Sequence, residues 1–200
     1  MARQGAARAA LLIIDFFNPR GFEGGLAAAT LRAARNTARL KARLRKAGVP
    51  AIYANDNFGN WQSEFTELVA QCRTIRGAPA AIADLLAPDE HDRSVLKPRH
   101  SAFYETPLEF LLADLGVTML VLTGVSADSC IMFTAHDAYL RKLDLWIPAD
   151  CVASPKPAYT RAALTHQERV LRASIVDSGA DLARMLSRHR QKRKSATSGK

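Results

Sequence analysis

An acid, an amine and a thiol stand at places in this sequence where they could do chemistry. Asp15 directly follows the apolar run 9–14, Lys97 ends the short segment 94–97, and Cys130 lies shortly after the apolar run 118–123. A carboxylate can accept a thiol proton, an ammonium group stabilises nearby negative charge, and a thiolate is a strong nucleophile. Together the three residue types could carry out covalent attack on a carbonyl carbon.

Each of these residues also has an ordinary structural interpretation. Free cysteines are among the most buried residue types, and most lysines lie on the surface. A carboxylate after a strand more commonly caps a loop than acts as a base. No one of the three residues indicates catalysis by itself, so the argument depends on their combination at the ends of predicted strands.

The alternation of apolar runs with amphipathic stretches predicts the elements that position these residues. Strands are predicted at 9–14, 50–54, 94–97, 118–123, 143–147 and 174–177. Helices are predicted at about 26–47, 64–71, 79–86, 107–115, 129–141 and 158–172, and from residue 180 onward. This order is typical of βαβ units, so we expect an α/β fold, a three-layer α/β/α sandwich with a mostly parallel six-stranded sheet. In such sheets the site lies at the carboxyl ends of the strands.

Cys130 is expected in the first turn of the helix 129–141. Unpaired backbone N–H groups and the helix dipole favour an anion there, which predicts a lowered thiol pKa. The same position would suit a small buried side chain that packs the helix onto the sheet. Position alone does not separate these two interpretations.

Length and composition are those of one globular domain, which we expect to span residues 1–185. The net charge of +9 is concentrated in a basic tail, predicted at 186–200 and expected to be disordered. Seven basic residues follow Asp181 with no further acid, which leaves about +2 for residues 1–183. A solubilising tail explains this charge better than a nucleic-acid partner does.

The cysteines and apolar runs bear on location. Cys72, Cys130 and Cys151 form no CxxC pair, so neither a disulfide framework nor a zinc knuckle is predicted. The longest apolar run is far shorter than the roughly 20 residues that span a bilayer. No signal peptide is recognised at the N-terminus, and we expect a cytoplasmic protein without a membrane partner.

The segments 11–15, 95–98 and 122–130 resemble those of the isochorismatase-like cysteine hydrolases, a family that includes nicotinamidases and N-carbamoylsarcosine amidases. The resemblance runs from about residue 9 to 153. It implies a catalytic triad of Asp15, Lys97 and Cys130, and a cis peptide bond between Val125 and Ser126. It also implies an oxyanion hole formed by the N–H groups of Ser126 and Cys130, and assembly as a homo-oligomer, a dimer or tetramer.

The function that this resemblance implies is hydrolysis of a small-molecule amide or related C–N bond through a thioester. A nicotinamidase-type or isochorismatase-type hydrolase and a catalytically silent binding protein of the same fold are the alternatives. A silent protein would have no reason to keep all three triad residues. A redox role ranks last, because no resolving cysteine lies near Cys130 in the sequence.

The sequence departs from nicotinamidases where those relatives hold a metal with an Asp-x-His pair. Asp56 is present here, but Phe58 stands at the histidine position. Because a zinc site normally needs three or four ligands, no metal and no other cofactor are predicted.

A small-molecule substrate is the expected partner, and its pocket is predicted from residues near the strand ends. Phe17 stands where relatives carry a glutamine, while Trp61 and Phe103 could equally belong to the core or to an interface. The predicted lining consists of Phe17, Asn18, Asn57, Trp61, Phe103, Tyr104, Phe133 and Thr134.

Overall fold

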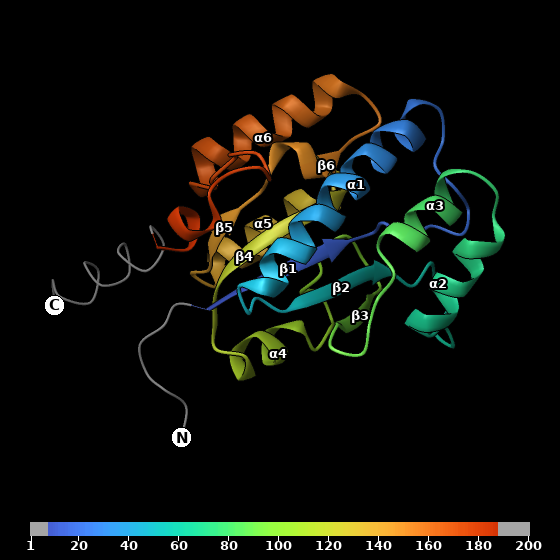
Figure 1. Ribbon diagram of the computed structural model, residues 1–200, viewed down its shortest axis with the longest axis horizontal. Helices are drawn as coiled ribbons and strands as arrows, with labels where there is room; N and C mark the ends of the chain where they lie inside the picture. Colours follow the sequence, from blue (N-terminus) through green and yellow to red (C-terminus); the bar gives the residue numbers. More distant parts are fainter. Residues whose placement is uncertain (1–7, 188–200) are drawn as a thin grey trace, which may run out of the picture.

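A six-stranded sheet forms the centre of the computed structural model, which describes residues 8–187 (Figure 1). The strands are β1 (Arg8–Ile14), β2 (Ala51–Asp56), β3 (Arg93–Lys97), β4 (Val117–Val125), β5 (Asp144–Trp146) and β6 (Val152–Ala153). Their order is β3-β2-β1-β4-β5, with β6 paired to the far end of β4, and every pairing is parallel. Parallel strands place their carboxyl ends at one edge, and this edge carries the candidate site.

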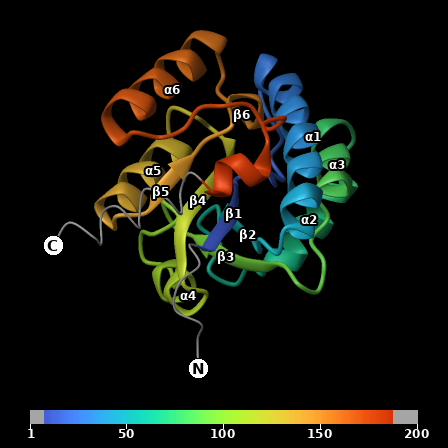
Figure 2. The same ribbon diagram turned by 60° about the vertical axis from the view of Figure 1, so that its left-hand side comes forward.

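Helices cover both faces of the sheet. They are α1 (Gly25–Lys46), α2 (Phe65–Thr74), α3 (Ala78–Leu85), α4 (Leu108–Asp114), α5 (Cys130–Leu140) and α6 (Pro157–Leu171). A 3-10 turn, η1 (Ala149–Cys151), precedes β6, and residues 182–187 are also helical. Figure 2 shows α1, α2 and α3 on one side of the sheet, with α4, α5 and α6 on the other. The predicted α/β/α sandwich is confirmed.

The central strand β1 explains why the chain folds into three layers. Leu11 and Ile13 belong to the core on the α1 side, whereas Leu12 and Ile14 belong to the core on the α5 side. Successive side chains of a strand point to opposite faces, so a strand covered on both faces must be apolar throughout. Each such buried side chain contributes about 1.5–3 kcal/mol.

The predicted sixth strand at 174–177 is wrong. Ser174 makes only an isolated bridge to Trp146 beside β5, with Ile147 N–H donating to the Ser174 carbonyl at 2.8 Å. The sixth strand is instead β6, which pairs Val152 with Gly124. Two residues are too few to show a strand period in the sequence, which is why β6 was not recognised.

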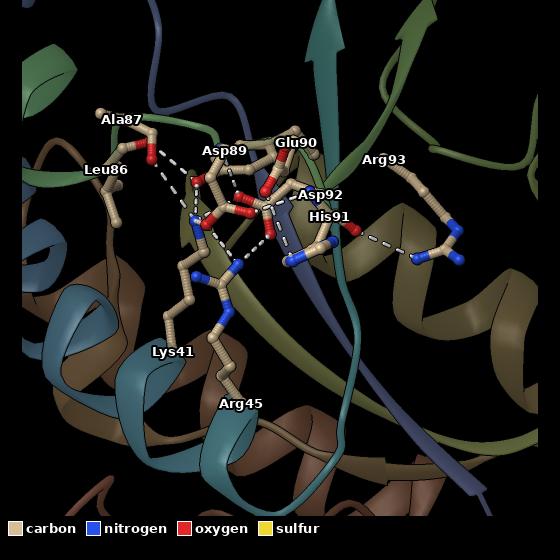
Figure 3. Close-up of polar contacts among 10 residues, drawn as sticks. Lys41, Arg45, Leu86, Ala87, Asp89, Glu90, His91, Asp92 and Arg93 are labelled. Atoms are coloured by element: carbon tan, nitrogen blue, oxygen red, sulfur yellow. Dashed lines mark hydrogen bonds and ion pairs between the residues drawn. The ribbon is translucent and has the colours of Figure 1, made fainter.

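A charged cluster ties α1 to the segment between α3 and β3 (Figure 3). Lys41 pairs with Asp92 and reaches the Tyr53 hydroxyl at 2.9 Å, while Arg45 pairs with Asp89 and lies 3.3 Å from Asp92. Asp92 precedes the first residue of β3, so this cluster lies at the edge of the sheet opposite to the carboxyl ends. We refer to Lys41, Arg45, Asp89 and Asp92 as the α1 ion cluster.

Two predictions concern the ends of the chain: the basic tail and the domain boundary before it. Residues 1–7 and 188–200 lie outside the described part, and with them most of the predicted basic tail. The boundary placed at residue 185 falls within the helical residues 182–187, and it remains a prediction. Between residues 8 and 187, no helix combines the length and the apolar character needed to cross a membrane.

Candidate active site

The carboxyl edge of the sheet brings the three predicted catalytic residues together. Asp15 follows β1, Lys97 is the last residue of β3, and Cys130 is the first residue of α5. The Lys97 Nζ atom lies 2.7 Å from Asp15 Oδ2 and 3.6 Å from Cys130 Sγ. The amine therefore contacts both the acid and the thiol, although 82 and 33 residues separate it from them in the chain.

Lys97 is fully buried, which is rare for a lysine unless its charge is compensated. Its ammonium group donates to the Arg99 carbonyl at 3.2 Å and lies 3.8 Å from Asp56 Oδ2. Burial lowers the pKa of Lys97, but the negative groups around it, Asp15 first, outweigh burial and raise that pKa above its ordinary value. The amine is therefore a fixed positive charge.

Asp15 is held in place by its backbone as well as by Lys97. Its φ of 52° is uncommon for a residue with a side chain. Its N–H donates to the Ala54 carbonyl at 3.1 Å, and its Oδ1 accepts from the Asp56 N–H at 2.7 Å. Burial raises the pKa of Asp15, while Lys97 and the Asp56 N–H oppose that rise. A carboxylate with a raised pKa binds a proton more readily, as a general base must.

The Cys130 thiol does not have the lowered pKa that a position in the first turn of a helix favours. Burial, followed by the negative charge of Asp15, raises its pKa to about 12, and Lys97 opposes this only in part. The prediction of a lowered pKa is therefore wrong for the free protein. A raised pKa favours the protonated thiol, so the position in the helix does not by itself make the sulfur a nucleophile.

The loop between β4 and α5 presents backbone donors beside the sulfur. The peptide bond between Val125 and Ser126 is cis, and the Ser126 carbonyl accepts from Ser129 and Ile131 N–H, each at 3.1 Å. The part of the loop that the structure describes shows no backbone acceptor for the N–H groups of Ser126 and Cys130. Their role as an oxyanion hole stays a prediction.

A cavity of about 760 Å³ has Asp56 in its wall, and the three predicted catalytic residues are not among the residues that line it. The predicted pocket residues Asn57, Trp61 and Tyr104 all line it. The Trp61 side chain is 81% exposed, so the cavity is open to solvent on that side. The connection between this cavity and the predicted catalytic residues is Asp56, whose Oδ2 lies 3.8 Å from Lys97 Nζ.

Three other predicted pocket residues belong to the core instead. Phe17 is buried, because its N–H donates to the Asn55 side chain and directs its ring against Tyr53. Thr134 is fully buried and accepts from the Ala102 N–H at 3.0 Å. Phe103 is 6% exposed, packed beneath a guanidinium group. None of the three lines the cavity.

Asn18 and Phe133 have structural contacts of a different kind. The Asn18 Oδ1 accepts from the Arg20 N–H at 2.9 Å, so this side chain shapes the loop after β1. Phe133 is 55% exposed and stacks on the ring of His100 with centroids 5.3 Å apart.

His100 is a site residue that the sequence reasoning missed. Its Nδ1 lies 3.7 Å from Cys130 Sγ and 3.3 Å from Ser129 Oγ. Spacing as a metal ligand, the property of histidines considered in the sequence, does not indicate an imidazole beside a thiol. The signal that could have identified His100 is its position three residues after Lys97, in the loop that leaves the same strand end.

The residues present do not fit the metal that nicotinamidase-like relatives carry. The Asp56 carboxylate accepts from the Phe58 N–H at 2.6 Å and faces Lys97. Across the described chain, no group of three or more His, Cys, Asp or Glu side chains could hold a metal ion. The loop after β2 therefore lacks the donor set for a metal centre.

The sheet order, and the acid, amine and thiol at its carboxyl edge, agree with the class of hydrolases that the sequence motifs resemble. Residues 9–178 match the family model described as Isochorismatase domain. The chain belongs to this family, whose members are hydrolases.

Relatives of known sequence or structure agree with this assignment. The chain is 39% identical over 168 residues to the uncharacterized isochorismatase family protein YaaI of Bacillus subtilis, covering 83% of this chain and 92% of YaaI. It is 27% identical over 190 residues to the ureidoacrylate amidohydrolase RutB of Methylorubrum extorquens, covering 79% and 75% of the two chains. An N-carbamoylsarcosine amidase from Thermoplasma acidophilum shares the fold, with a TM-score of 0.68, 23% identity and coverage of 88% and 99%.

Proposed function

We propose that this hydrolase cleaves the C–N bond of a small amide, or a related C–N bond, with Cys130 as the nucleophile. The observation that carries the proposal is the position of Lys97 Nζ, 2.7 Å from the Asp15 carboxylate and 3.6 Å from the sulfur. The relatives described as an amidohydrolase and an amidase support a C–N bond as the target.

The proposed reaction proceeds through a thioester. Asp15 takes the thiol proton as the sulfur attacks the carbonyl carbon, and the charge of Lys97 stabilises the anion that forms. The N–H groups of Ser126 and Cys130 bind the oxyanion, where one such donor is typically worth about 3–4 kcal/mol in acyl transfer. The C–N bond then breaks, the nitrogen leaves with a proton, and water cleaves the thioester to an acid and the thiol.

The proposed chemistry needs no metal ion. Support comes from Phe58, which occupies the position of a histidine ligand. It also comes from the Asp56 carboxylate, which already accepts a hydrogen bond from the Phe58 N–H. We expect full activity after dialysis against a strong chelator, measured as the rate of ammonia release. Activity that is lost on dialysis and restored by a divalent metal would contradict this part of the proposal.

We also propose a reducing, cytoplasmic location. All three cysteines are free, and Cys72 and Cys151 are buried as thiols. Proteins of oxidising compartments commonly pair their cysteines, so three free thiols support a reducing compartment. Fractionation of cells that express the chain at native level would test the location.

A panel of primary amides and ureas, assayed for ammonia release, tests the function. Cys130→Ala should abolish turnover of any active compound, because no other group supplies the nucleophile. Cys72→Ala is the matched control, since Cys72 is a buried thiol in α2 away from the site, and it should retain activity. Turnover by a folded Cys130→Ala protein would refute the assignment, with circular dichroism as the check on folding.

A further inference from the structure

The sulfur of Cys130 has a third polar neighbour besides Asp15 and Lys97. His100 Nδ1 lies 3.7 Å from Sγ, within hydrogen-bond distance for sulfur. The Asp15–Lys97 pair is almost inaccessible to water, with side chains 12% and 0% exposed, whereas His100 is exposed. The sulfur is thus contacted both by a buried ion pair and by an imidazole that reaches solvent.

Two contacts hold the imidazole in this position. Its ring stacks on Phe133 of α5 with an interplanar angle of 23°. The same Nδ1 atom lies 3.3 Å from Ser129 Oγ, and a hydroxyl group can either donate or accept. The arrangement therefore accommodates Nδ1 with or without a proton, as an acid–base group requires.

From this geometry we infer that His100 is a second acid–base residue of the site, which exchanges protons with the leaving nitrogen and with water. The inference rests on the proposed function. It assigns to His100 the proton transfer to the leaving nitrogen and from the attacking water. Asp15 is enclosed with Lys97, so the proton it takes from the thiol stays beside the sulfur. His100 is exposed, so its imidazole can exchange protons with water.

The proton balance closes over one turnover. After Asp15 has taken the thiol proton, the imidazolium Nδ1–H transfers to the leaving nitrogen as the C–N bond breaks, leaving a neutral imidazole. The imidazole then accepts a proton from the attacking water as the C–O bond forms. The C–S bond breaks, and the thiolate recovers its proton from Asp15.

The charged groups around the sulfur set the expected pH dependence. They are Asp15 after β1, Asp56 of β2, Lys97 of β3 and the imidazolium form of His100 in the loop after β3. A protonated imidazole at this distance adds a positive charge near the sulfur and so favours the thiolate. A substitution that removes the imidazole removes this charge.

Alkylation of Cys130 by iodoacetamide tests the inference without a substrate. The rate is measured against pH by mass spectrometry of the Cys130 peptide, in wild type, His100→Phe and His100→Asn. An opposite charge next to a thiol commonly shifts its pKa by about one unit, so wild type should react about tenfold faster than either variant near about pH 6. The ratio should approach one as the pH rises above about 9.

His91→Phe is the matched control, because His91 is an exposed histidine in the loop that leads into β3, at the opposite edge of the sheet. It should follow wild type at every pH. The Cys72 and Cys151 peptides report on folding, since both thiols are buried. Should the phenylalanine variant unfold, the smaller asparagine variant gives the same comparison. Equal rates for wild type and a folded His100 variant at every pH would overturn the inference, while leaving the role of Cys130 intact.

The leaving group provides the second test. The test is measured in the first turnover, before the thioester is hydrolysed. The leaving group of an activated ester departs without a proton, so His100→Phe should release it in that turnover at nearly the wild-type rate. First-turnover release of the nitrogen from an amide with the same acyl group should fall about 100-fold, as expected when a general acid is lost. Equal losses on both substrates would overturn the acid role. Turnover by Cys130→Ala would instead overturn the proposed function itself, so the two failures are distinguishable.

Discussion

Lys97 shows how the fold tolerates a full charge inside the protein. The side chain has no exposed surface, and its partner Asp15 is only 12% exposed. Removing either charge would leave the other buried and uncompensated, whereas removing both would not. The pair therefore couples the stability of the protein to the geometry of its site.

Lys97→Met should lower the free energy of unfolding by about 3–5 kcal/mol, because Asp15 would lose its buried counterion. Lys46→Met is the control, since Lys46 is exposed at the end of α1 and should change stability by less than about 0.5 kcal/mol. Urea unfolding measures both. The double variant Asp15→Asn/Lys97→Met should be more stable than Lys97→Met alone, and strict additivity of the single effects would contradict the argument.

The buried thiol of Cys151 should make the protein lose stability at alkaline pH. Burial, followed by the charge of Asp150, raises the pKa of Cys151 from 9.0 to about 12. Above about pH 9 the unfolded chain releases this proton while the folded chain keeps it, so the free energy of unfolding falls as pH rises through this window. One such group contributes about 1.4 kcal/mol per pH unit.

Cys151→Ala should therefore show a shallower loss of stability between about pH 9 and 11 in urea unfolding. Val152→Ala is the matched control, because it truncates a neighbouring buried side chain that does not titrate. Parallel pH profiles for wild type and Cys151→Ala would contradict the assignment of the shift to this thiol.

The positions of Asp15, Lys97 and Cys130 could be predicted because strand ends in a parallel sheet converge. What the sequence does not contain is the direction of each side chain after the strand ends. Phe17 lies in the core, where its backbone N–H and C=O are both hydrogen-bonded to the side chain of Asn55, a residue 38 positions away. His100 reaches the sulfur because the chain folds back after Lys97. Both outcomes depend on tertiary contacts that have no local pattern.

At the scale of elements, the pairing of β1 with β4 places the acid next to the loop that carries the thiol. Ile14 is opposite Gly124 in this register, and Gly124 has a φ of 133°. A Cβ atom on Gly124 would lie 1.9 Å from the Ile14 carbonyl oxygen, which is backbone and cannot move aside cheaply. Glycine is required at position 124 for two reasons. The Ile14 backbone leaves no room for a Cβ atom, and a φ of 133° is unfavourable for a residue that has one.

Gly124→Ala should therefore destabilise the protein by more than about 3 kcal/mol, since both strain and a backbone clash result. It should also slow alkylation of Cys130 in whatever fraction stays folded, because β1 and β4 would separate at the site. Gly25→Ala is the matched control, as its Cβ would meet nothing within 4 Å. It should be neutral or stabilising by up to about 1 kcal/mol in thermal unfolding. Similar melting curves for the two variants would refute the explanation.

The α1 ion cluster acts at the other edge of the sheet (Figure 3). Arg45, through its contact with the carboxylate, and the His91 N–H lower the pKa of Asp89 below its ordinary value of 3.8. A lowered pKa means that the folded state favours the ionised form, so this stability is present above 3.8 and is lost as the pH falls below it. Because the pair is exposed, the contribution is small and sensitive to salt.

Asp89→Asn should make the acid limb of the stability profile shallower between about pH 5 and 2, and added salt should reduce the difference from wild type. Glu90→Gln is the control. The Glu90 side chain is exposed, and its ion pair in the described part of the chain is with His91, outside the α1 ion cluster. Urea unfolding across this pH range provides the measurement. Equal effects of the two substitutions on the acid limb of the stability profile would contradict the assignment of the lowered Asp89 pKa to its contact with Arg45.

Most elements could be predicted because their signals are local. The run 9–14 is apolar throughout, and the α1 sequence is rich in helix-forming residues, so both elements follow from periodicity and propensity. The exception is the sixth strand. The predicted segment 174–177 contains an isoleucine and a valine, which are strand-forming residue types, but it makes one bridge only, at Ser174. Val152 and Ala153 pair with β4 in a two-residue strand instead. Pairing at the rim of a sheet is decided by tertiary packing.

At the scale of the whole molecule, two helices joined by an ion pair each carry a large, exposed apolar side chain. Phe110 of α4 is 79% exposed, and Leu140 of α5 is 74% exposed. An ion pair of 2.8 Å between Glu109 and Arg141 joins these two helices. Large exposed apolar side chains are common at protein interfaces. Assembly as a homo-oligomer stays a prediction, and these two side chains are the place to test it.

We expect the wild-type protein to self-associate in solution, with a mass above that of one chain by light scattering coupled to size exclusion. Phe110→Ser/Leu140→Ser should shift the mass to one chain, because the interface would lose its apolar contacts. Val176→Ser, which alters an exposed valine in the segment after α6, is the control and should not change the mass. A double variant that assembles like wild type would place any interface elsewhere. Asp15, Lys97 and Cys130 all belong to one chain. Iodoacetamide should therefore alkylate Cys130 of the dissociated variant at the wild-type rate.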